Sequence, residues 1–294
     1  MIRSLILCLL LTACSSPPRH GGVDGFVDNG DDLSSSNKMY DFAGQPQQGC
    51  TGQANDCFAV YAHSDHVLYY IDLSTKMLVT VGTMSQTTDS ITDLAVAPDG
   101  TIYVISKANL YRADAVNAAL TLVGPVKLCG NDNIALSFTP DGSLYVADHL
   151  TGAFCKIDLS VNPPTVIPVG NIGGGMALTG DIVTIGDGTM YGTAYKLSDT
   201  GTKGTQSNNL LIKINPATGA SIQVVGSTNY PKLFGVAYAL GQVFGFTHDG
   251  TGDVITINPS TGVGTLFNTF KDPATGMGIS FGGAGVNSLV PAIP

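Results

Sequence analysis

Five residues that can contact a ligand recur at one position of an internal repeat. Each lies seven residues after a turn position, which is Asp56 in the first copy and a glycine (100, 142, 188 and 241) in the others. Imidazole groups bind ligands and move protons near neutral pH, while lysine adds a charge and tyrosine a hydroxyl. We predict that these side chains form a ring on one ligand-binding face: His63, Lys107, His149, Tyr195 and His248.

Further polar residues precede the strands that should lie nearest the centre of the fold. In a fold of repeated sheets, the connections from outer to inner strands emerge beside the ring, so these residues should share its face. We therefore add Asp89, Asp93 and Asn133 to the candidate ligand-binding residues. The alternative, that the polar residues of this face are ordinary solvated loop residues, stays open at this point.

The histidines do not predict a metal centre, and no catalytic residue stands out. The ring positions end the second strand of each blade, one interstrand spacing outside the innermost strand. Neighbouring positions are then roughly 13 Å apart and alternate ones about 20 Å apart. Zinc needs its nitrogen ligands about 2 Å away, so only His63 and His248 could converge. Nucleophile-elbow, phosphate-loop and zinc-protease motifs are absent from the sequence. We predict a binding module without a cofactor; the alternative is a sugar or lactone hydrolase with an Asp-based or metal-assisted channel site.

The elements that must position the ring are short strands joined by turns. The turn glycines precede strands at intervals of about forty to fifty residues, and Pro-Asp-Gly at 98–100 and 140–142 favours tight turns. A second landmark, an Asp or Asn that ends the third strand, occurs five times: Asp72, Asp114, Asp158, Asn215 and Asn258. Repeats of four strands predict an all-β propeller with five blades. Six blades remain possible if residues 37–44 add strands.

The two ends of the repeat region are complementary. The first repeat starts at 57–61 without an innermost strand, and residues 278–282 form an innermost strand with nothing after it. Pairing the two would cover both open strand edges. We therefore expect the C-terminal strand to close the ring through the first blade.

The segments 94–104 and 136–148 resemble the NHL-type and gluconolactonase-type propeller repeats of bacteria. For gluconolactonase-like enzymes the resemblance implies a divalent metal held in the channel by a glutamate. This sequence contains no Glu, since all 22 acidic residues are Asp. The resemblance therefore supports the fold more strongly than lactone hydrolysis.

The N-terminus has the pattern of an exported, lipid-anchored protein. Residues 1–14 combine Arg3, an apolar run and Leu11-Thr12-Ala13-Cys14, which resembles the bacterial lipobox whose cysteine is lipidated. In that pattern, Ser15 after the cysteine favours the outer membrane. Residues 15–48 are rich in Ser, Gly, Asp and Asn and predict a flexible tether. The propeller domain should span 49–290, and we expect a monomer in the cell envelope.

The net charge limits the classes of binding partner, and the cysteine content predicts disulfide bonds. The net charge is −9, and phosphate binding needs clustered Lys and Arg, so we expect an envelope protein or small ligand rather than nucleic acid. Four cysteines remain in the mature chain, an even number that favours disulfides in an exported protein. Of three possible pairings we favour those within one blade, and four buried thiols are the alternative. The favoured pairs are Cys50–Cys57 and Cys129–Cys155.

Overall fold

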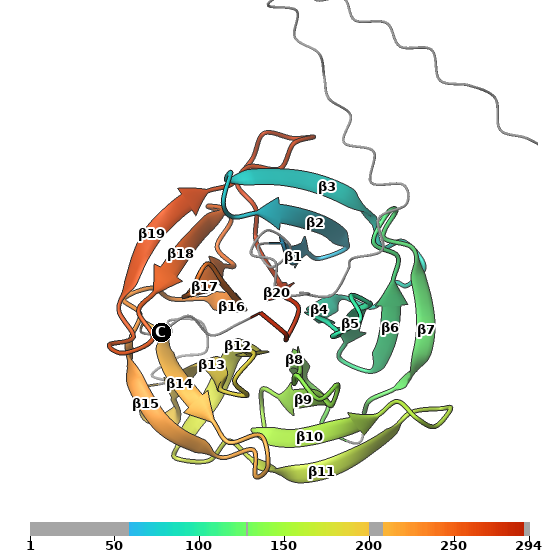
Figure 1. The fold of residues 1–294 in the computed structure, drawn as a ribbon, viewed down its shortest axis with the longest axis vertical. Coiled ribbons are helices and arrows are strands. Elements are labelled where there is room, and N and C mark those ends of the chain that lie inside the picture. Colours follow the sequence, from blue (N-terminus) through green and yellow to red (C-terminus); the bar gives the residue numbers. More distant parts are fainter. Residues whose placement is uncertain (1–58, 128, 200–207, 291–294) are drawn as a thin grey trace, which may run out of the picture. The chain divides into compact units, whose positions relative to one another are not determined.

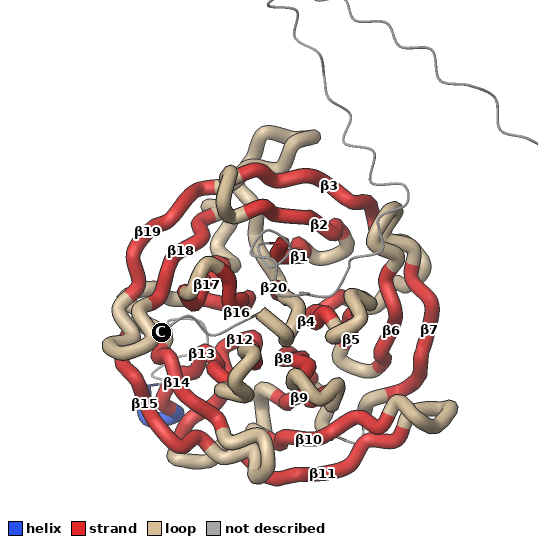
Figure 2. Tube along the Cα trace, in the orientation of Figure 1, coloured by secondary structure: helices blue, strands red, loops and turns tan. Residues whose placement is uncertain are grey.

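Five four-stranded antiparallel sheets surround a common axis in the computed structural model, which describes residues 59–127, 129–199 and 208–290. The protein is therefore an all-β, five-bladed propeller, as predicted (Figure 1). Within each blade the four strands lie side by side, ordered from the axis to the outer edge, as the tube in Figure 2 also shows. The short 3₁₀ helix η1 (Leu197–Asp199) follows the second strand of blade 4.

Blade 1 contains β20 (Gly283–Gly285), β1 (Ala59–Ser64), β2 (Val67–Asp72) and β3 (Met77–Thr83). Blade 2 contains β4 (Ile91–Val96), β5 (Ile102–Ser106), β6 (Asn109–Ala113) and β7 (Leu120–Pro125). Blade 3 contains β8 (Asn133–Phe138), β9 (Leu144–Asp148), β10 (Ala153–Asp158) and β11 (Thr165–Asn171). Blade 4 contains β12 (Met176–Thr184), β13 (Met190–Lys196), β14 (Leu210–Ile214) and β15 (Ser221–Ser227). Blade 5 contains β16 (Leu233–Ala239), β17 (Gln242–Thr247), β18 (Asp253–Ile257) and β19 (Gly264–Thr269).

The Asp-Gly turns between first and second strands form as their residue types require. Gly100 and Gly142 have φ of 86° and 81°, a conformation that glycine adopts without steric cost. The Asp before each glycine accepts a hydrogen bond from the amide two residues on, at 2.9 Å for Asp99 and 3.0 Å for Asp141. These local bonds explain why the turns could be predicted from the sequence.

Ring closure through the C-terminal strand is also confirmed, although the strand lies further along the chain than expected. The pairs that join β20 to β1 include Tyr61 with Gly285 and His63 with Gly283. The predicted strand 278–282 is instead the crossing from blade 5 to blade 1. In this crossing Ile279 and Phe281 are almost fully buried. Their alternation with polar or small residues gives the crossing the pattern of a strand.

The chain after β20 covers the end of the channel opposite to the predicted ring. Asn287 donates to the carbonyl of Ala97 at 3.2 Å, and Ser288 donates to that of Thr139 at 3.2 Å. The Gly186 amide donates to the carbonyl of Val290 at 2.9 Å. These three contacts lie at the Asp-Gly turns of blades 2, 3 and 4, so the C-terminal segment closes this end of the channel.

Candidate functional site: a pocket on the propeller axis

A pocket with a volume of about 290 Å³ lies at the other end of the channel. Blades 2 to 5 contribute to its wall, as does the crossing that leads into blade 1. Its apolar lining comes from Ile91, Ile134 and Phe234, and its polar lining comes from Thr92, Lys107, Asp132, His149, Thr179 and His248. Gly180 and Gly282 complete the wall. A mostly apolar concavity with a few converging polar groups is the usual form of a small-molecule site.

β-Bulges turn the innermost side chains toward this pocket. The register of the first two strands shifts between Ile91 and Asp93, between Asn133 and Ala135, and between Leu233 and Gly235. The bulged residues are thus Thr92, Ile134 and Phe234, and all three line the pocket. Bulges commonly re-aim side chains beside functional sites. A bulge in the innermost strand thus directs one side chain into the pocket in each of blades 2, 3 and 5.

Lys107, His149 and His248, three of the five predicted ring residues, line the pocket. Each side chain contacts the chain that leads into the next blade. Lys107 Nζ lies 2.7 Å from Asp132 Oδ1, and His248 Nδ1 lies 2.9 Å from the carbonyl oxygen of Phe281. His149 Nδ1 lies 2.6 Å from the carbonyl oxygen of Leu178. The ring position thus joins consecutive blades and also places its side chain at the pocket.

The other two ring residues do not line the pocket. Tyr195 is almost buried, and its hydroxyl lies 3.5 Å from Nε2 of His149, at the long limit for a hydrogen bond. Burial raises the pKa of the Tyr195 hydroxyl. Tyr195 therefore stands behind His149.

His63 does not occupy the ring position. Pairing of the second and third strands aligns His63 with Ile105, two residues before Lys107. Asp65 therefore holds the ring position of blade 1. The count from Asp56 was wrong because the first repeat lacks the turn glycine from which the other four positions are counted.

The His63 side chain is completely buried behind the pocket wall. A Cβ on Gly282, which lines the pocket, would lie 2.6 Å from its Cε1 atom. Neither ring nitrogen makes a hydrogen bond of good geometry with a described residue, and the Asp65 backbone offers only a weak contact. Burial lowers the pKa of His63 to about 4, with the Asp65 carbonyl partly opposing and His248 adding to the effect. His63 is thus a neutral imidazole in the interior.

Asp93 lies one residue deeper than the lining residue Thr92, and Asp181 occupies the equivalent position in β12. Both are fully buried and hydrogen-bonded to each other. Burial raises both pKa values, and the neighbouring Asp181 raises that of Asp93 further. The pair therefore holds a proton that two exposed carboxylates would lose.

These two carboxyls join the innermost strands beneath the pocket. Asp93 accepts a hydrogen bond from the amide of Leu136 in blade 3 at 2.6 Å. Asp181 accepts one from Val236 in blade 5 at 2.8 Å and a longer one, 3.4 Å, from Ala284 in β20. Their oxygens are occupied by backbone amides and lie out of reach of a bound molecule. The pair therefore has a structural role in holding the ring closed.

Asp89 and Asn133 are also engaged in structural contacts. Asp89 Oδ2 accepts hydrogen bonds from Ser106 and Asn109 at 3.2 and 3.1 Å. Asn133 is buried, and its side-chain amide donates to the carbonyl of Lys107 at 2.9 Å. Neither side chain lines the pocket, although Asn133 fixes the backbone of Lys107, which does.

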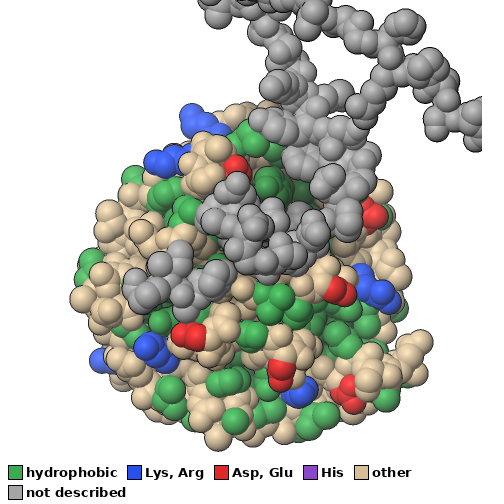
Figure 3. Space-filling model, in the orientation of Figure 1, with side chains coloured by type: hydrophobic (Ala, Val, Ile, Leu, Met, Phe, Trp, Pro, Cys, Tyr) green, Lys and Arg blue, Asp and Glu red, His purple; other side chains and the backbone are tan. Residues whose placement is uncertain are grey.

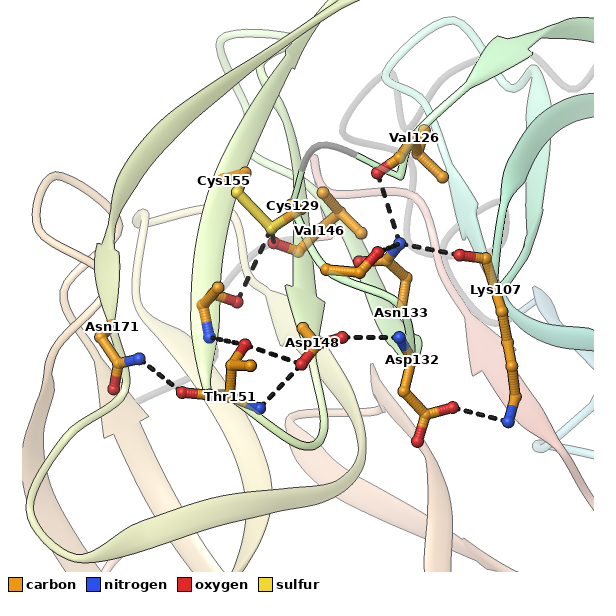
Figure 4. The surroundings of a disulfide bond; sticks show 12 residues. Lys107, Val126, Cys129, Asp132, Asn133, Val146, Asp148, Thr151, Cys155 and Asn171 are labelled. Carbon is orange, nitrogen blue, oxygen red and sulfur yellow. Dashed lines mark hydrogen bonds and ion pairs between the residues drawn. A yellow bond between two sulfur atoms is a disulfide. The ribbon is translucent and has the colours of Figure 1, made fainter.

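The predicted disulfide between Cys129 and Cys155 is present, with Cα atoms 5.8 Å apart (Figure 4). It fastens β10 to the loop that carries Asp132, whose amide donates to Asp148 at 2.6 Å. Burial works to raise the pKa of Asp148, but hydrogen bonds from Thr151 and Asp132 outweigh it and lower the pKa overall. A charged Asp148 and the disulfide thus hold this part of the pocket rim. The other predicted bond, Cys50–Cys57, lies outside the described residues, as do Cys14, the signal segment and the tether.

Two important lining residues were not among the predicted candidates. Thr179 is 3% exposed, and its hydroxyl has no hydrogen-bond partner among the described residues. Phe234 lies parallel to His248, with ring centroids 4.4 Å apart. Both belong to innermost strands, where their hydrophobic neighbours indicate core positions. Only the register irregularities of β12 and β16 reveal that they face the pocket.

The axial residues do not fit the divalent metal of the gluconolactonase-type enzymes. The described part of the chain has no group of three or more His, Cys, Asp or Glu that could hold a metal. Asp93 and Asp181 are engaged with backbone amides. The described axial residues therefore do not supply the ligands that such a metal needs.

The outer surface adds two observations. On the face drawn in Figure 3, the Lys, Arg and Asp side chains are scattered among hydrophobic and other residues wherever grey atoms leave them visible. Among the residues that the structure describes, no helix is long and apolar enough to cross a membrane.

Comparison with known proteins leaves the family open. No protein-family model matches the chain, and no curated protein sequence matches it. The similarity to NHL-type and gluconolactonase-type repeats thus remains a resemblance of the segments 94–104 and 136–148.

Proposed function

We propose that this protein is a binding module whose axial pocket holds a small ligand. The observation that carries the proposal is the buried Thr179 hydroxyl, which lines the pocket and has no hydrogen-bond partner in the part of the chain that the structure describes. An unmade hydrogen bond at a buried hydroxyl costs about 1–3 kcal/mol, and a ligand that completes it recovers this energy. The flanking imidazoles of His149 and His248 are held in place by backbone carbonyls at 2.6 and 2.9 Å. Such a preformed site favours binding because little side-chain order must be created.

Binding is favoured over hydrolysis by the state of the carboxyl groups. A glycosidase needs two carboxyls that reach the substrate, about 5 to 10 Å apart. The axial pair, Asp93 and Asp181, is buried beneath the lining. Asp132, which does line the pocket, is paired with Lys107 at 2.7 Å. No pair of carboxyls is therefore available for acid and base roles among the described lining residues.

We further propose that the module works in the bacterial cell envelope, anchored through a lipid on Cys14. The lipobox-like residues 11–14 and the polar tether 15–48 support this location. A tether of roughly thirty flexible residues would hold the propeller about 30 Å from the membrane. The pocket would then be free to take a ligand from the surrounding solution.

Thermal-shift screening of small molecules, followed by calorimetric titration of the hits, tests the proposal. Ligands of the axial pocket should raise the melting temperature of the wild-type protein. His149→Ala and His248→Ala should each lose most of the affinity. His66→Ala is the matched control, because His66 does not line the pocket and bonds instead to the carbonyl of Asp89 at 3.1 Å. Hits that bind all three variants equally would place the binding site elsewhere.

A further inference from the structure

We propose that the ligand of this pocket is an uncharged molecule that donates at least two hydrogen bonds, through hydroxyl or N–H groups. The inference rests on the proposed function and adds the chemical class of the ligand. Three observations on the described residues carry it: the carbonyl contacts of two imidazoles, the ion pair of the one lysine in the lining, and the Thr179 hydroxyl without a partner.

The proton positions follow from what the imidazoles contact. His149 Nδ1 lies 2.6 Å from the carbonyl of Leu178, and His248 Nδ1 lies 2.9 Å from that of Phe281. A carbonyl oxygen only accepts hydrogen bonds, so each Nδ1 must carry the hydrogen and donate it. In a neutral imidazole the other nitrogen, Nε2, is then an acceptor. Two acceptors of the same kind are therefore offered by blades 3 and 5.

Both imidazoles are fixed in this orientation. His248 lies flat against Phe234, with an angle of 6° between the rings. The backbone amide of His149 donates to the carbonyl of Asp132, and that of His248 donates to the carbonyl of Lys232, both at 2.9 Å. Among the described residues, the one donor near either Nε2 is the Tyr195 hydroxyl, which lies 3.5 Å from that of His149. A ligand donor at about 2.9 Å would replace this long contact.

The charge of the lining argues against an anionic ligand. Lys107 is the one Lys or Arg among the described lining residues, and its Nζ lies 2.7 Å from Asp132 Oδ1. The Lys107 side chain is 59% exposed and Asp132 is 16% exposed, so the pair covers part of the rim. With this charge neutralised and the chain at −9, the pocket offers an anion little attraction.

The Thr179 hydroxyl completes the set, because it lines the same pocket and can accept or donate. The apolar walls at Ile91, Ile134 and Phe234 suit a compact ring or hydrocarbon body. The volume of about 290 Å³ lies at the small end of the usual range for ligand pockets. The ligand is therefore a small apolar body with two or more donor groups.

Three ring compounds of similar size test the chemical class: resorcinol with two hydroxyls, 1,3-dimethoxybenzene with both hydroxyls capped, and isophthalate with two carboxylates. Each is titrated into the protein at pH 7.5 while NMR records the ¹⁵N shifts of the histidine rings. Resorcinol should move the Nε2 signals of His149 and His248 and leave His66 unchanged. The other two probes should bind at least tenfold more weakly, because they bring no donor to two acceptors.

Thr179→Val provides a second measurement with a distinctive signature. Replacing the unpartnered hydroxyl with a methyl should raise the melting temperature of the free protein. The same change should weaken resorcinol binding several-fold. A residue that only packs would not shift stability and affinity in opposite directions.

The inference is overturned if isophthalate or the dimethyl ether moves the same Nε2 signals at equal or lower concentration. Failure of resorcinol to bind up to its solubility limit overturns it as well. In either case the thermal-shift screen still decides separately whether the pocket binds a small molecule at all.

Discussion

Acid should destabilise the folded domain through His63, because the interior excludes a charged imidazole. The pKa of His63 is lowered from 6.5 to about 4 by burial. Between these values the unfolded chain binds a proton that the folded chain does not, so stability falls as pH falls through this window. At 1.36 kcal/mol for each pKa unit, the full loss is about 3 kcal/mol by pH 4. Above about pH 6.5 the contribution of a neutral His63 is fully present.

His63→Leu isolates this effect. Neither ring nitrogen makes a hydrogen bond of good geometry with a described residue, so the substitution mainly removes the group that titrates. The free energy of unfolding should be measured with urea at pH 7, 5.5 and 4.5. As pH falls, that of the variant should become steadily larger than that of the wild type, because only the wild type is destabilised by acid. Most of the roughly 3 kcal/mol should appear by the lowest pH. His66→Leu, which changes a partly exposed imidazole, should show no comparable trend. Parallel pH profiles for wild type and His63→Leu would refute a buried neutral imidazole.

Three further predictions concern the ring and its anchor. Asp181→Asn breaks one amide contact, which should cost about 1–2 kcal/mol near pH 5. The pKa values of Asp93 and Asp181 are raised, so the wild type loses stability as pH rises above about 4. The cost of the substitution, measured by guanidinium unfolding, should therefore shrink toward pH 9. A cost that grows with pH would contradict the shared proton. Cys129→Ala opens a loop of 26 residues and should lower stability by about 3 kcal/mol, with Cys155 becoming reactive to a thiol reagent on unfolding; an unchanged melting temperature would contradict this role. Cys14→Ala should leave an unlipidated protein in the aqueous phase of a detergent partition, and its recovery in the detergent phase would exclude the lipobox.

The features that could be predicted from sequence depend on local signals. Pro-Asp-Gly at 98–100 and 140–142 specifies a turn by itself, and five third-strand Asp or Asn residues set the blade number. The Cys129–Cys155 bond followed from the constraint that both cysteines belong to one blade. Closure followed from two unpaired ends, because an open strand edge is costly.

The features that were missed depend on tertiary register. The ring offset was wrong at His63 because the first repeat has no turn glycine to count from. Asp93 was predicted on the surface, whereas a bulge in β4 and the pairing with Asp181 bury it. Thr179 and Phe234 look like core residues in the sequence, and only the strand irregularities turn them toward the axis.

A crystal structure of the protein soaked with a library of small fragments tests the central claim most directly. The account predicts that bound fragments gather in the axial pocket, with hydrogen bonds to Nε2 of His149 or His248 and to the Thr179 hydroxyl. Fragments that occupy only the outer surface, while the axial pocket holds solvent alone in every soak, would contradict it.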